Sequence, residues 1–550
     1  MKNRIALILI IALVGCTKQD SFELKIAPDI ESRLAKFAAV DISTDITFLP
    51  ENEQKALLKI IEASHFMQEI FLRQVWQGNP ELLAKLQKAS GTKYKSALAY
   101  FKIMAGPWDR LQAEEPFIGE MEKPHGAGYY PTDITKKEFE SFVASLSPEE
   151  GAKLKDLCTI VGRENGKLTA TPYSQAFEKW LEPAAKLLKE AAELTENASL
   201  KDYLIKRAKA FSTDDYYESD MAWMDIDSPV EVTIGPYEVY EDGLFGFKAA
   251  FESFVTVADP EASKKLAVYK SWLPKMEANL PIPDKMKNFD RGSESPIRVV
   301  DEVFTAGDTR AGVQTIAFNL PNDEKVREAK GSKKVILRNV LMAKYEKILE
   351  PIAAQFVVPE QLDHLSSDAF TNNVLFHELS HGLGPGKIMK DGRETEVRFE
   401  LKDLYSACEE AKADVMGIYN ILFMQDKNVM PASLYKTTAV TYLAGLFRSV
   451  RFGATEAHGR GVALQIYYLL EDGSIELDKN TGKFSVNFDQ FPGGIRKLVR
   501  EICILQAAGD YDGTKLIFEK YANLDAELAQ QLENLTDIPV DIVPNYPMAE

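Results

Sequence analysis

Apolar and polar residues follow two different spacings along the chain, one helical and one typical of strands. Residues 51–104 and 146–211 are rich in Ala, Leu, Lys and Glu and place apolar positions three or four residues apart, which predicts helices. Residues 105–135, between them, are rich in Gly, Pro and Tyr and predict a loop. The alternating pattern of Val230–Tyr240 predicts a strand, and Val299–Asn319 predicts further strands. The pattern therefore favours an α+β protein that is mostly helical.

The second half of the chain is dominated by helical spacing from Val335 onward. Within it, Leu401–Met424 has the apolar spacing of a helix with one buried face. Segments 279–296 and 320–333 contain Pro, Gly and Ser and predict loops. Turn residues near both ends of segment 472–482 predict a short hairpin.

Length and charge narrow the classes of protein to which the chain can belong. With 550 residues, of which 45% are hydrophobic and 27% charged, it can bury substantial cores and is expected to divide into more than one domain. A formal net charge of −18 argues against a nucleic-acid partner, because basic surfaces dominate affinity for nucleic acid. An acidic cleft would instead attract peptides with a free N-terminal ammonium.

The N-terminal segment has the layout of a signal peptide. Met1–Arg4 is short and basic, and Ile5–Val14 is uniformly apolar but too short to span a bilayer as a mature helix. Leu13–Cys16 resembles a bacterial lipobox, so we expect residues 1–15 to be removed and Cys16 to be acylated. The expected location is the bacterial cell envelope, with the chain anchored to a membrane by lipid. The alternative is an ordinary cleaved signal peptide.

The other cysteines do not form a disulfide framework. Cys158, Cys408 and Cys503 are odd in number and far apart in the sequence, so we expect them to be buried small apolar residues. Cys408 adjoins a glutamate, but no base stands near it in the sequence to activate a nucleophilic thiol.

The pentapeptide from His377 to His381, His-Glu-Leu-Ser-His, has the spacing of a zinc-hydrolase motif. In a helix, residues four apart project from the same face, about 6 Å apart along the axis, so both imidazoles can reach one metal ion. Glu378 lies off that axis but close enough to take a proton from a metal-bound water. Glycines and a proline follow His381, as expected where such a helix ends. The alternative interpretation is two surface histidines one turn apart.

A third metal ligand is expected in the run Glu409-Glu410-Ala411-Lys412-Ala413-Asp414. Glu410 can complete a set of two histidines and one glutamate, which leaves a fourth position open for water. Asp414 and Glu409 would accept hydrogen bonds from the far ring nitrogens of the histidines. A three-histidine site is excluded because Lys387 stands where its third histidine would be. The alternative is a solvated acidic stripe.

With these two motifs the chain resembles peptidase family M49, the dipeptidyl peptidase III type, in the branch with a five-residue zinc motif. The Glu-Glu-x-x-Ala-Asp element, with its second glutamate as ligand, is characteristic of that family. The better-studied branch has one more residue between the histidines, so the shorter motif leaves catalytic efficiency and substrate preference open. Other segments that resemble the family are 106–110, 123–131, 234–242, 248–252, 319–322 and 456–460.

The resemblance also implies roles for residues outside the metal motif. Glu238, Asn319 and Asn322 would hold the N-terminal ammonium of a peptide at a fixed distance from the metal. Tyr240 and His458 would donate hydrogen bonds toward the carbonyl oxygen as it gains charge. Other interpretations stay open from the residues alone: a strand with two unlike faces for Glu238 and Tyr240, a turn for the asparagines, and a core histidine for His458.

By resemblance, the fold has two lobes around a wide cleft: a mixed lobe with a small β-barrel and a helical lobe that holds zinc. We expect the mixed lobe to span residues 16–260 and the zinc lobe 261–550, with segment 297–348 packing against the mixed lobe.

The implied function is a zinc exopeptidase, with one Zn²⁺ per chain, that releases dipeptides from the N-terminus of short peptides. The alternatives are a zinc endopeptidase or aminopeptidase of different register and a noncatalytic peptide-binding lipoprotein. The sequence predicts no oligomeric state.

Overall fold

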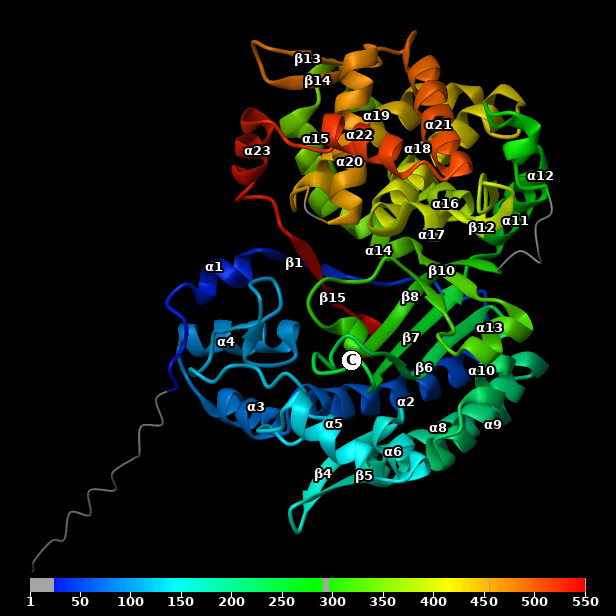
Figure 1. Ribbon diagram of the computed structural model, residues 1–550. Coiled ribbons are helices and arrows are strands. Elements are labelled where there is room, and N and C mark those ends of the chain that lie inside the picture. Colours follow the sequence, from blue (N-terminus) through cyan, green and yellow to red (C-terminus); the bar gives the residue numbers. More distant parts are fainter. Residues whose placement is uncertain (1–23, 290–295, 455, 550) are drawn as a thin grey trace, which may run out of the picture.

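The computed structural model describes residues 24–289, 296–454 and 456–549, which form two lobes, one above the other in Figure 1. The lower lobe combines a sheet with helices, and the upper lobe is built mainly of helices. This arrangement confirms the predicted fold class, a mostly helical α+β protein of two lobes. The expected signal peptide and Cys16 lie outside the described residues.

The lower, mixed lobe is formed by most of the first half of the chain, by a later segment and by the last strand. Its elements are α1 (Ile30–Ala35), β1 (Phe37–Asp41), α2 (Glu51–Val75), α3 (Asn79–Lys88), α4 (Thr92–Met104), β2 (Trp108–Asp109), β3 (Glu115–Pro116), α5 (Lys136–Ala144), α6 (Pro148–Lys155), β4 (Thr159–Glu164), β5 (Lys167–Pro172), α7 (Tyr173–Ala176), α8 (Glu178–Leu194), α9 (Ala198–Thr213), α10 (Tyr217–Met224), β6 (Val230–Glu238), β7 (Ala250–Ala258), β8 (Ile297–Gly307), β9 (Ala317–Leu320), α13 (Glu324–Lys330), β10 (Lys333–Leu337) and β15 (Asp541–Asn545).

The upper, helical lobe takes two helices from the middle of the chain and most of the second half. Its elements are α11 (Pro260–Ser271), α12 (Leu273–Asn279), α14 (Arg338–Lys344), α15 (Glu350–Phe356), α16 (Ser367–Ser380), β11 (Lys387–Lys390), β12 (Arg393–Glu396), α17 (Val397–Leu401), α18 (Tyr405–Asp426), α19 (Tyr435–Val450), α20 (Ala457–Asp472), β13 (Ile475–Asp478), β14 (Lys483–Val486), α21 (Phe491–Ala508), α22 (Tyr511–Tyr521) and α23 (Ala526–Glu533).

The main sheet of the mixed lobe has the strand order β6-β7-β8-β10-β9. β8 and β10 run parallel, and the other neighbours are antiparallel. Every residue of β7 is buried, and α2 packs against both β7 and β8. Within the described residues, the hydrogen-bonded strands run from β6 to β9, and these two strands do not pair to close a barrel. β9 is therefore an edge strand.

Segments far apart in the sequence complete the mixed lobe. β8, β9 and β10, from residues 297–337, share the sheet with β6 and β7. The last strand, β15, returns from the helical lobe and pairs in parallel with β1, with Phe37 opposite Asp541. The division of the chain at residue 260 stays a prediction.

Two stretches that were expected to be helical are β-hairpins. β4 and β5 are joined by Asn165-Gly166, and β11 and β12 are joined by Asp391-Gly392. All four turn residues have positive φ, from 50° to 77°. Asn-Gly and Asp-Gly favour the two-residue turns whose twist matches paired strands, so this local signal overrides the helical composition around it.

The other elements agree largely with their predictions. Helices α2, α3, α4 and α18, the strand β6 and the hairpin of β13 and β14 lie where the sequence predicts them. Segment 320–333 differs, because it contains the 7-residue helix α13. The side chain of Asp323 caps this helix by accepting hydrogen bonds from the backbone nitrogens of Lys325 and Val326.

Candidate active site

Helices α16 and α18 pack against each other and bring the two predicted metal motifs together. α16 ends at Ser380, with His381 as its C-terminal cap, so both histidines belong to its last turn. Gly417 of α18 permits the close approach: a Cβ there would lie 3.0 Å from the backbone nitrogen of His377. A Cβ at this position would require the neighbouring backbone of α16 to shift by a few tenths of an ångström.

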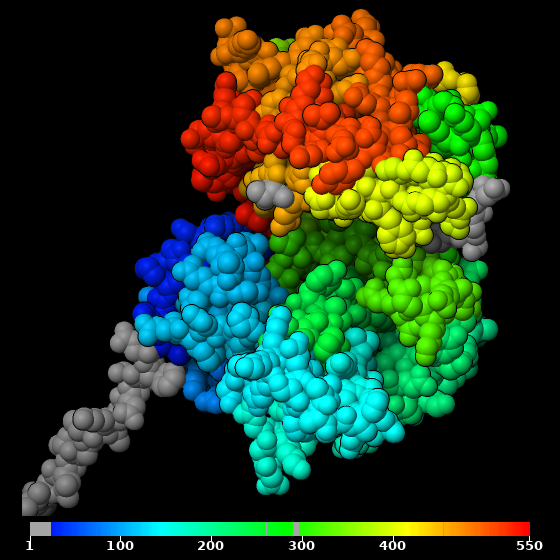
Figure 2. Space-filling model, in the orientation of Figure 1, coloured from blue at the N-terminus to red at the C-terminus, as the bar shows by residue number. Residues whose placement is uncertain are grey.

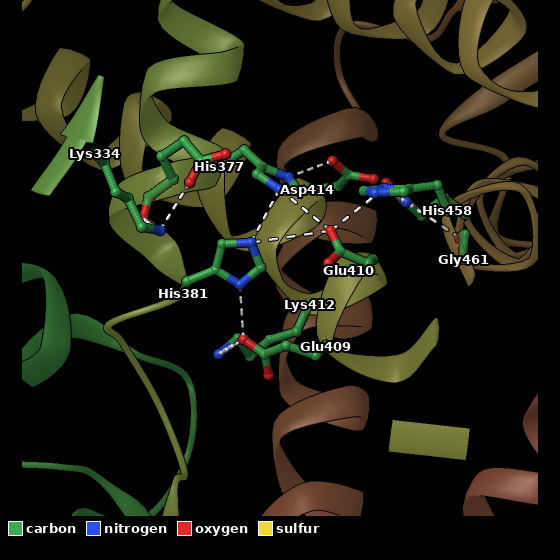
Figure 3. A network of polar contacts seen from close by, with 11 residues as sticks. Lys334, His377, His381, Glu409, Glu410, Lys412, Asp414, His458 and Gly461 are labelled. Carbon is green, nitrogen blue, oxygen red and sulfur yellow. Dashed lines mark hydrogen bonds and ion pairs between the residues drawn. The ribbon is translucent and has the colours of Figure 1, made fainter. Parts of the chain in front are cut away.

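Three side-chain atoms converge between these helices (Figure 3). Nε2 of His377 lies 3.1 Å from Nε2 of His381. Oε2 of Glu410 lies 3.3 Å from the first nitrogen and 3.9 Å from the second. The sequence prediction that these residues share one site therefore agrees with their geometry.

The far ring nitrogens of both histidines face carboxylates. Nδ1 of His377 lies 2.7 Å from Asp414, and Nδ1 of His381 lies 3.0 Å from Glu409. Because an ionised carboxylate only accepts hydrogen bonds, each Nδ1 carries a proton, and in the neutral imidazole each Nε2 turns a lone pair toward Glu410. Asp414 and Glu409 thus stand in the orienting positions that the sequence predicts.

These carboxylates have partners that the sequence analysis missed. Gln465 of α20 donates to Asp414 at 3.0 Å, and Gln506 of α21 donates to Glu409 at 3.0 Å. Lys412 lies 2.7 Å from Glu409. These side chains come from three helices, and no spacing along the chain relates the glutamines to the histidines.

The charges of this cluster hold the carboxylates ionised. Burial opposes ionisation of Glu409, but Lys412 and His381 outweigh it and lower the pKa of Glu409 to about 2. Burial likewise opposes ionisation of Asp414, whose pKa is nevertheless lowered, chiefly by His377. Burial also opposes charge on His377, yet Asp414 raises the pKa of that imidazole to about 10. The cluster therefore favours positive charge at its centre.

The donor set fits a zinc ion. A tetrahedral ion with bonds of about 2.0–2.1 Å holds its ligand atoms about 3.3 Å apart. Two of the separations found here, 3.1 and 3.3 Å, are close to this value, and the third is 3.9 Å. Oε2 of Glu410 is buried and takes part in no hydrogen bond within the described residues. A buried carboxylate oxygen that faces two ring nitrogens needs a positive charge among them, which either a protonated imidazole or a metal ion can supply. His377, His381 and Glu410 are therefore the residues that would hold the metal.

Glu378 lies beside this cluster, with its ligand oxygen within 4.8 Å of those of both histidines. Its carboxylate, however, lies 2.7 Å from Nζ of Lys334, which also donates to the backbone oxygen of Glu378. Burial disfavours the charged carboxylate, but Lys334 outweighs this and lowers the pKa of Glu378. Glu378 thus forms an ion pair with Lys334 and is not one of the three residues that would hold the metal.

Lys334 belongs to β10 of the mixed lobe, whereas Glu378 belongs to α16 of the helical lobe. The ion pair therefore joins the two lobes next to the metal cluster. Sequence analysis missed Lys334, because it follows another lysine in a strand and resembles any polar strand residue.

His458 lies at the start of α20, on the other side of Glu410. Its Nδ1 is 3.3 Å from Oε2 of Glu410, and its side chain is 69% exposed. His458 is consequently a histidine of the open cleft and not a core histidine.

The residues predicted to bind the peptide N-terminus gather at a second cavity. Glu238, Tyr240 and Asn319 line a cavity of about 330 Å³. Asn322 donates from Nδ2 to the carboxylate of Glu238 at 3.2 Å and to the backbone oxygen of Tyr237 at 3.1 Å. Tyr240 is 85% exposed, so its hydroxyl is available to a ligand.

Two further carboxylates line this cavity and were not predicted, Glu252 of β7 and Asp308. Burial raises the pKa of Glu252 well above its usual value, and Asp308 adds to the effect. Burial also raises the pKa of Asp308 to about 7, although Arg110 opposes the shift. The cavity therefore holds carboxyl groups that lack cations, and a bound cation would favour their ionised form. Glu252 lies in segment 248–252, which resembles the peptidase family. This resemblance was the sequence signal that could have identified Glu252 as a residue of the site.

A third feature, a cavity of about 420 Å³, lies beside the metal cluster and is lined by His377, Glu378 and His458. Ala317 of the edge strand β9 lines both this cavity and the acidic one. Figure 2 shows the surface hollowed between the two lobes. The site is thus a cleft with the metal cluster at the larger cavity and the acidic cavity beyond Ala317.

The described cysteines take no part in this site. Cys158, Cys408 and Cys503 are free and buried, as predicted. Burial raises the pKa of the Cys408 thiol, which excludes a reactive thiolate next to Glu409.

Comparisons with known proteins agree on one family. A model of peptidase family M49 matches residues 114–421. The structure of DPP III from Caldithrix abyssi is 50% identical, with a TM-score of 0.90 over 94% of this chain and 99% of that one. The structure of dipeptidyl-peptidase III from Corallococcus sp. strain EGB is 41% identical, with a TM-score of 0.76 over 96% of this chain and 98% of that one.

One relative has a different name. A protein of Arabidopsis thaliana named Nudix hydrolase 3 is 36% identical over 95% of this chain. The match covers 74% of that protein.

Proposed function

The chain belongs to peptidase family M49 and is a metallopeptidase, and on that premise we propose that it is a zinc-dependent exopeptidase that releases dipeptides from the N-terminus of short peptides. The observation that carries this proposal is the placing of an acidic cavity beside a donor set that fits zinc. A cation-binding cavity at a fixed distance from the reacting centre measures the substrate from its free N-terminus.

The acidic cavity supplies the clamp for the ammonium group. Glu238 is held by Asn322, and Glu252 and Asp308 add carboxyl groups without enough cations to neutralise them. A peptide ammonium entering this cavity would supply the missing charge and make charge-assisted hydrogen bonds. An acetylated N-terminus has neither the charge nor the donors.

The edge strand β9 contributes Ala317 to both the acidic cavity and the cavity beside the metal cluster. An edge strand presents unpaired backbone groups, to which an extended peptide can add as a further strand. This would carry the peptide from the acidic cavity past Ala317 toward His377, with its backbone held in register.

The metal would be held by His377, His381 and Glu410, with Asp414 and Glu409 fixing the imidazoles. Zinc bound there supplies Lewis acidity, which polarises the scissile carbonyl and lowers the pKa of water. Glu378 is ionised beside this position and would take the proton of the attacking water on its carboxylate before passing it to the leaving nitrogen.

Other residues would act on the substrate directly or through Glu378. Lys334 keeps Glu378 ionised and fixes its direction. Tyr240 and His458 are both exposed to the cleft, and each would donate to the carbonyl oxygen as negative charge develops on it.

The discriminating experiment is mass spectrometry of the products from a mixed peptide library, with and without a chelator. We expect N-terminal dipeptides, produced only from peptides with free N-termini and lost with the chelator. Internal cleavage or release of single residues would favour a zinc endopeptidase or an aminopeptidase. Peptide binding without products would favour a noncatalytic binding protein.

The proposed location in the bacterial cell envelope rests on Cys16, which lies outside the described residues. No described helix combines the length and apolar character that a membrane span needs. If lipid on Cys16 anchors the chain, Cys16→Ser should move it from the membrane fraction to the soluble fraction. Unchanged membrane attachment of this variant would instead indicate another anchor.

A further inference from the structure

The cavity beside the metal cluster has an unusual wall. Most of its lining is apolar, as Phe370, Leu446 and Phe452 illustrate. Among the described residues that line this cavity, Arg448 of α19 is the one with a lysine or arginine side chain. A permanently charged guanidinium in an apolar wall has lost much of its hydration and needs either a partner or a ligand.

Arg448 has no anionic partner within the described part of the chain. Its Nε is buried and takes part in no hydrogen bond. Its guanidinium faces the ring of Phe370, and the ring centroid lies 5.6 Å from Cζ of Arg448. Burial lowers the pKa of Arg448, although arginine remains protonated in proteins.

Neighbouring charges are already engaged. The nearby carboxylate of Asp541 lies 2.8 Å from Nζ of Lys344 and also accepts a hydrogen bond from the backbone nitrogen of Gln314. Arg451 donates to the backbone oxygens of Pro539 and Ile538 at 2.8 and 3.1 Å. The uncompensated positive charge therefore stays on Arg448.

The two cavities of the cleft differ in which charges lack a partner. Glu238, Glu252 and Asp308 line the acidic cavity. Arg448 lines the other cavity together with Glu378 and Asp414, but Lys334 and His377 already engage those two carboxylates. The metal cluster lies at the cavity of Arg448, and Ala317 lines both. A short peptide has the matching polarity, with an ammonium at one end and a carboxylate at the other.

We propose that Arg448 binds a substrate carboxylate on the C-terminal side of the scissile bond. This inference rests on the proposed function, since it requires a peptide to lie in the cleft with its N-terminus in the acidic cavity. The apolar surroundings strengthen the ion pair, because little water competes for the guanidinium. Short peptides whose free C-terminus reaches Arg448 are then the preferred substrates.

Two sources can supply this carboxylate, the peptide C-terminus and an Asp or Glu side chain that follows the scissile bond. Three peptides distinguish them. Two share one sequence and end in a free acid or in a C-terminal amide. The third is the same amide with its last residue replaced by Glu. We expect the wild-type protein to cleave the free acid on the order of tenfold better than the amide, as expected for a charge-assisted hydrogen bond. Recovery with the Glu amide assigns the subsite to acidic side chains, and no recovery assigns it to the C-terminus.

The variant Arg448→Gln should abolish the preference for the free acid while it still cleaves the amide. Arg500→Gln is the matched control, because Arg500 is exposed on α21 and lines neither cavity. Arg448→Lys keeps the charge but loses the planar donor pair, so it should retain part of the preference. Thermal unfolding of each variant checks that the fold is intact.

Binding gives a second readout that does not require turnover. In a Glu378→Gln background, calorimetry should find the free acid bound more tightly than the amide, and Arg448→Gln should remove this difference. If the wild-type protein cleaves and binds the free acid and the amide equally well, the proposal is wrong, whether or not the variants fold. Products other than dipeptides would refute the proposed release of dipeptides, but the cleavage of the free acid and the amide could still be compared.

Discussion

Two groups of carboxylates, one around the histidines and one in the acidic cavity, differ in how their charge is neutralised. Glu409 and Asp414 each have a histidine, and each is further held by side chains from other helices. Their pKa values are lowered even though they are buried. Glu252 and Asp308 of the acidic cavity lack sufficient cations, and burial raises their pKa values.

The difference separates carboxylates whose charge the protein itself balances, Glu409 and Asp414, from carboxyl groups whose charge a ligand must balance. Around the histidines, the protein supplies every charge that fixes the ligand atoms before a metal binds. In the acidic cavity the balancing cation must come from outside, as the ammonium of a peptide does. The five expected outcomes below test this contrast, from the largest effect to the smallest.

Removal of a metal ligand should have the largest effect. Glu410→Ala reduces three protein ligands to two, so zinc affinity should fall on the order of a hundredfold or more and activity should be lost. Zinc content after dialysis, measured by atomic absorption, checks this. Glu519→Ala, an exposed change in the same lobe, should retain the metal. Stoichiometric zinc in a His377→Ala/His381→Ala variant would rule out this site.

The proposed base next to the cluster, Glu378, can be replaced without changing the proposed metal ligands. Glu378→Gln keeps the shape but cannot accept a proton, so kcat should fall on the order of a hundredfold to ten-thousandfold while zinc content stays unchanged. Steady-state kinetics on a free-acid peptide measures this. Activity within a few-fold of wild type would place the base elsewhere.

The acidic cavity is tested from the substrate side. Acetylation of the peptide N-terminus removes the cation that the cavity lacks, and cleavage should fall on the order of a hundredfold because the charge-assisted hydrogen bonds to the cavity's carboxyl groups are lost. Glu238→Gln should narrow the gap between free and acetylated peptides by slowing the free one. Equal cleavage of both peptides by wild type would refute the dipeptidyl register and leave the metal site intact.

The ion pair between the lobes should have a moderate effect. Lys334→Gln leaves Glu378 without the cation that orients it, so kcat should fall about tenfold with little change in KM. Lys334→Arg should restore part of the activity, and the exposed Lys325→Gln should behave as wild type. If KM rises and kcat does not change, Lys334 contributes to binding and not to the position of Glu378.

The smallest effect concerns stability and pH. Because the folded pKa of Asp308 is about 7 and so lies above its ordinary value, its contribution to stability is present at low pH and is lost as pH rises from about 4 through 7. Asp308→Asn removes this dependence, so its melting temperature relative to wild type should rise by about 1–3 °C between pH 5 and pH 8. Calorimetric scans at both pH values measure the difference. A constant difference would mean that Asp308 is ionised across this range.

Local sequence signals account for much of the fold. The spacing of apolar residues predicts the helices α2, α3, α4 and α18, and turn residues predict the hairpin of β13 and β14. The missed hairpins also had local signals, Asn165-Gly166 and Asp391-Gly392, which composition obscured. By contrast, no local pattern predicts that β15 pairs with β1, because the partners lie at opposite ends of the chain.

The sequence by itself determined which residues are the candidate metal ligands, because His377, His381 and Glu410 stand on two helices whose periodicity fixes which side chains share a face. Only the tertiary structure decided what surrounds them. Lys334 reaches Glu378 from the other lobe, and Arg448 lacks an anion because Lys344 already engages Asp541. Pairing and burial of charge depend on distances between segments far apart in the chain, and these distances exist only once the lobes have packed.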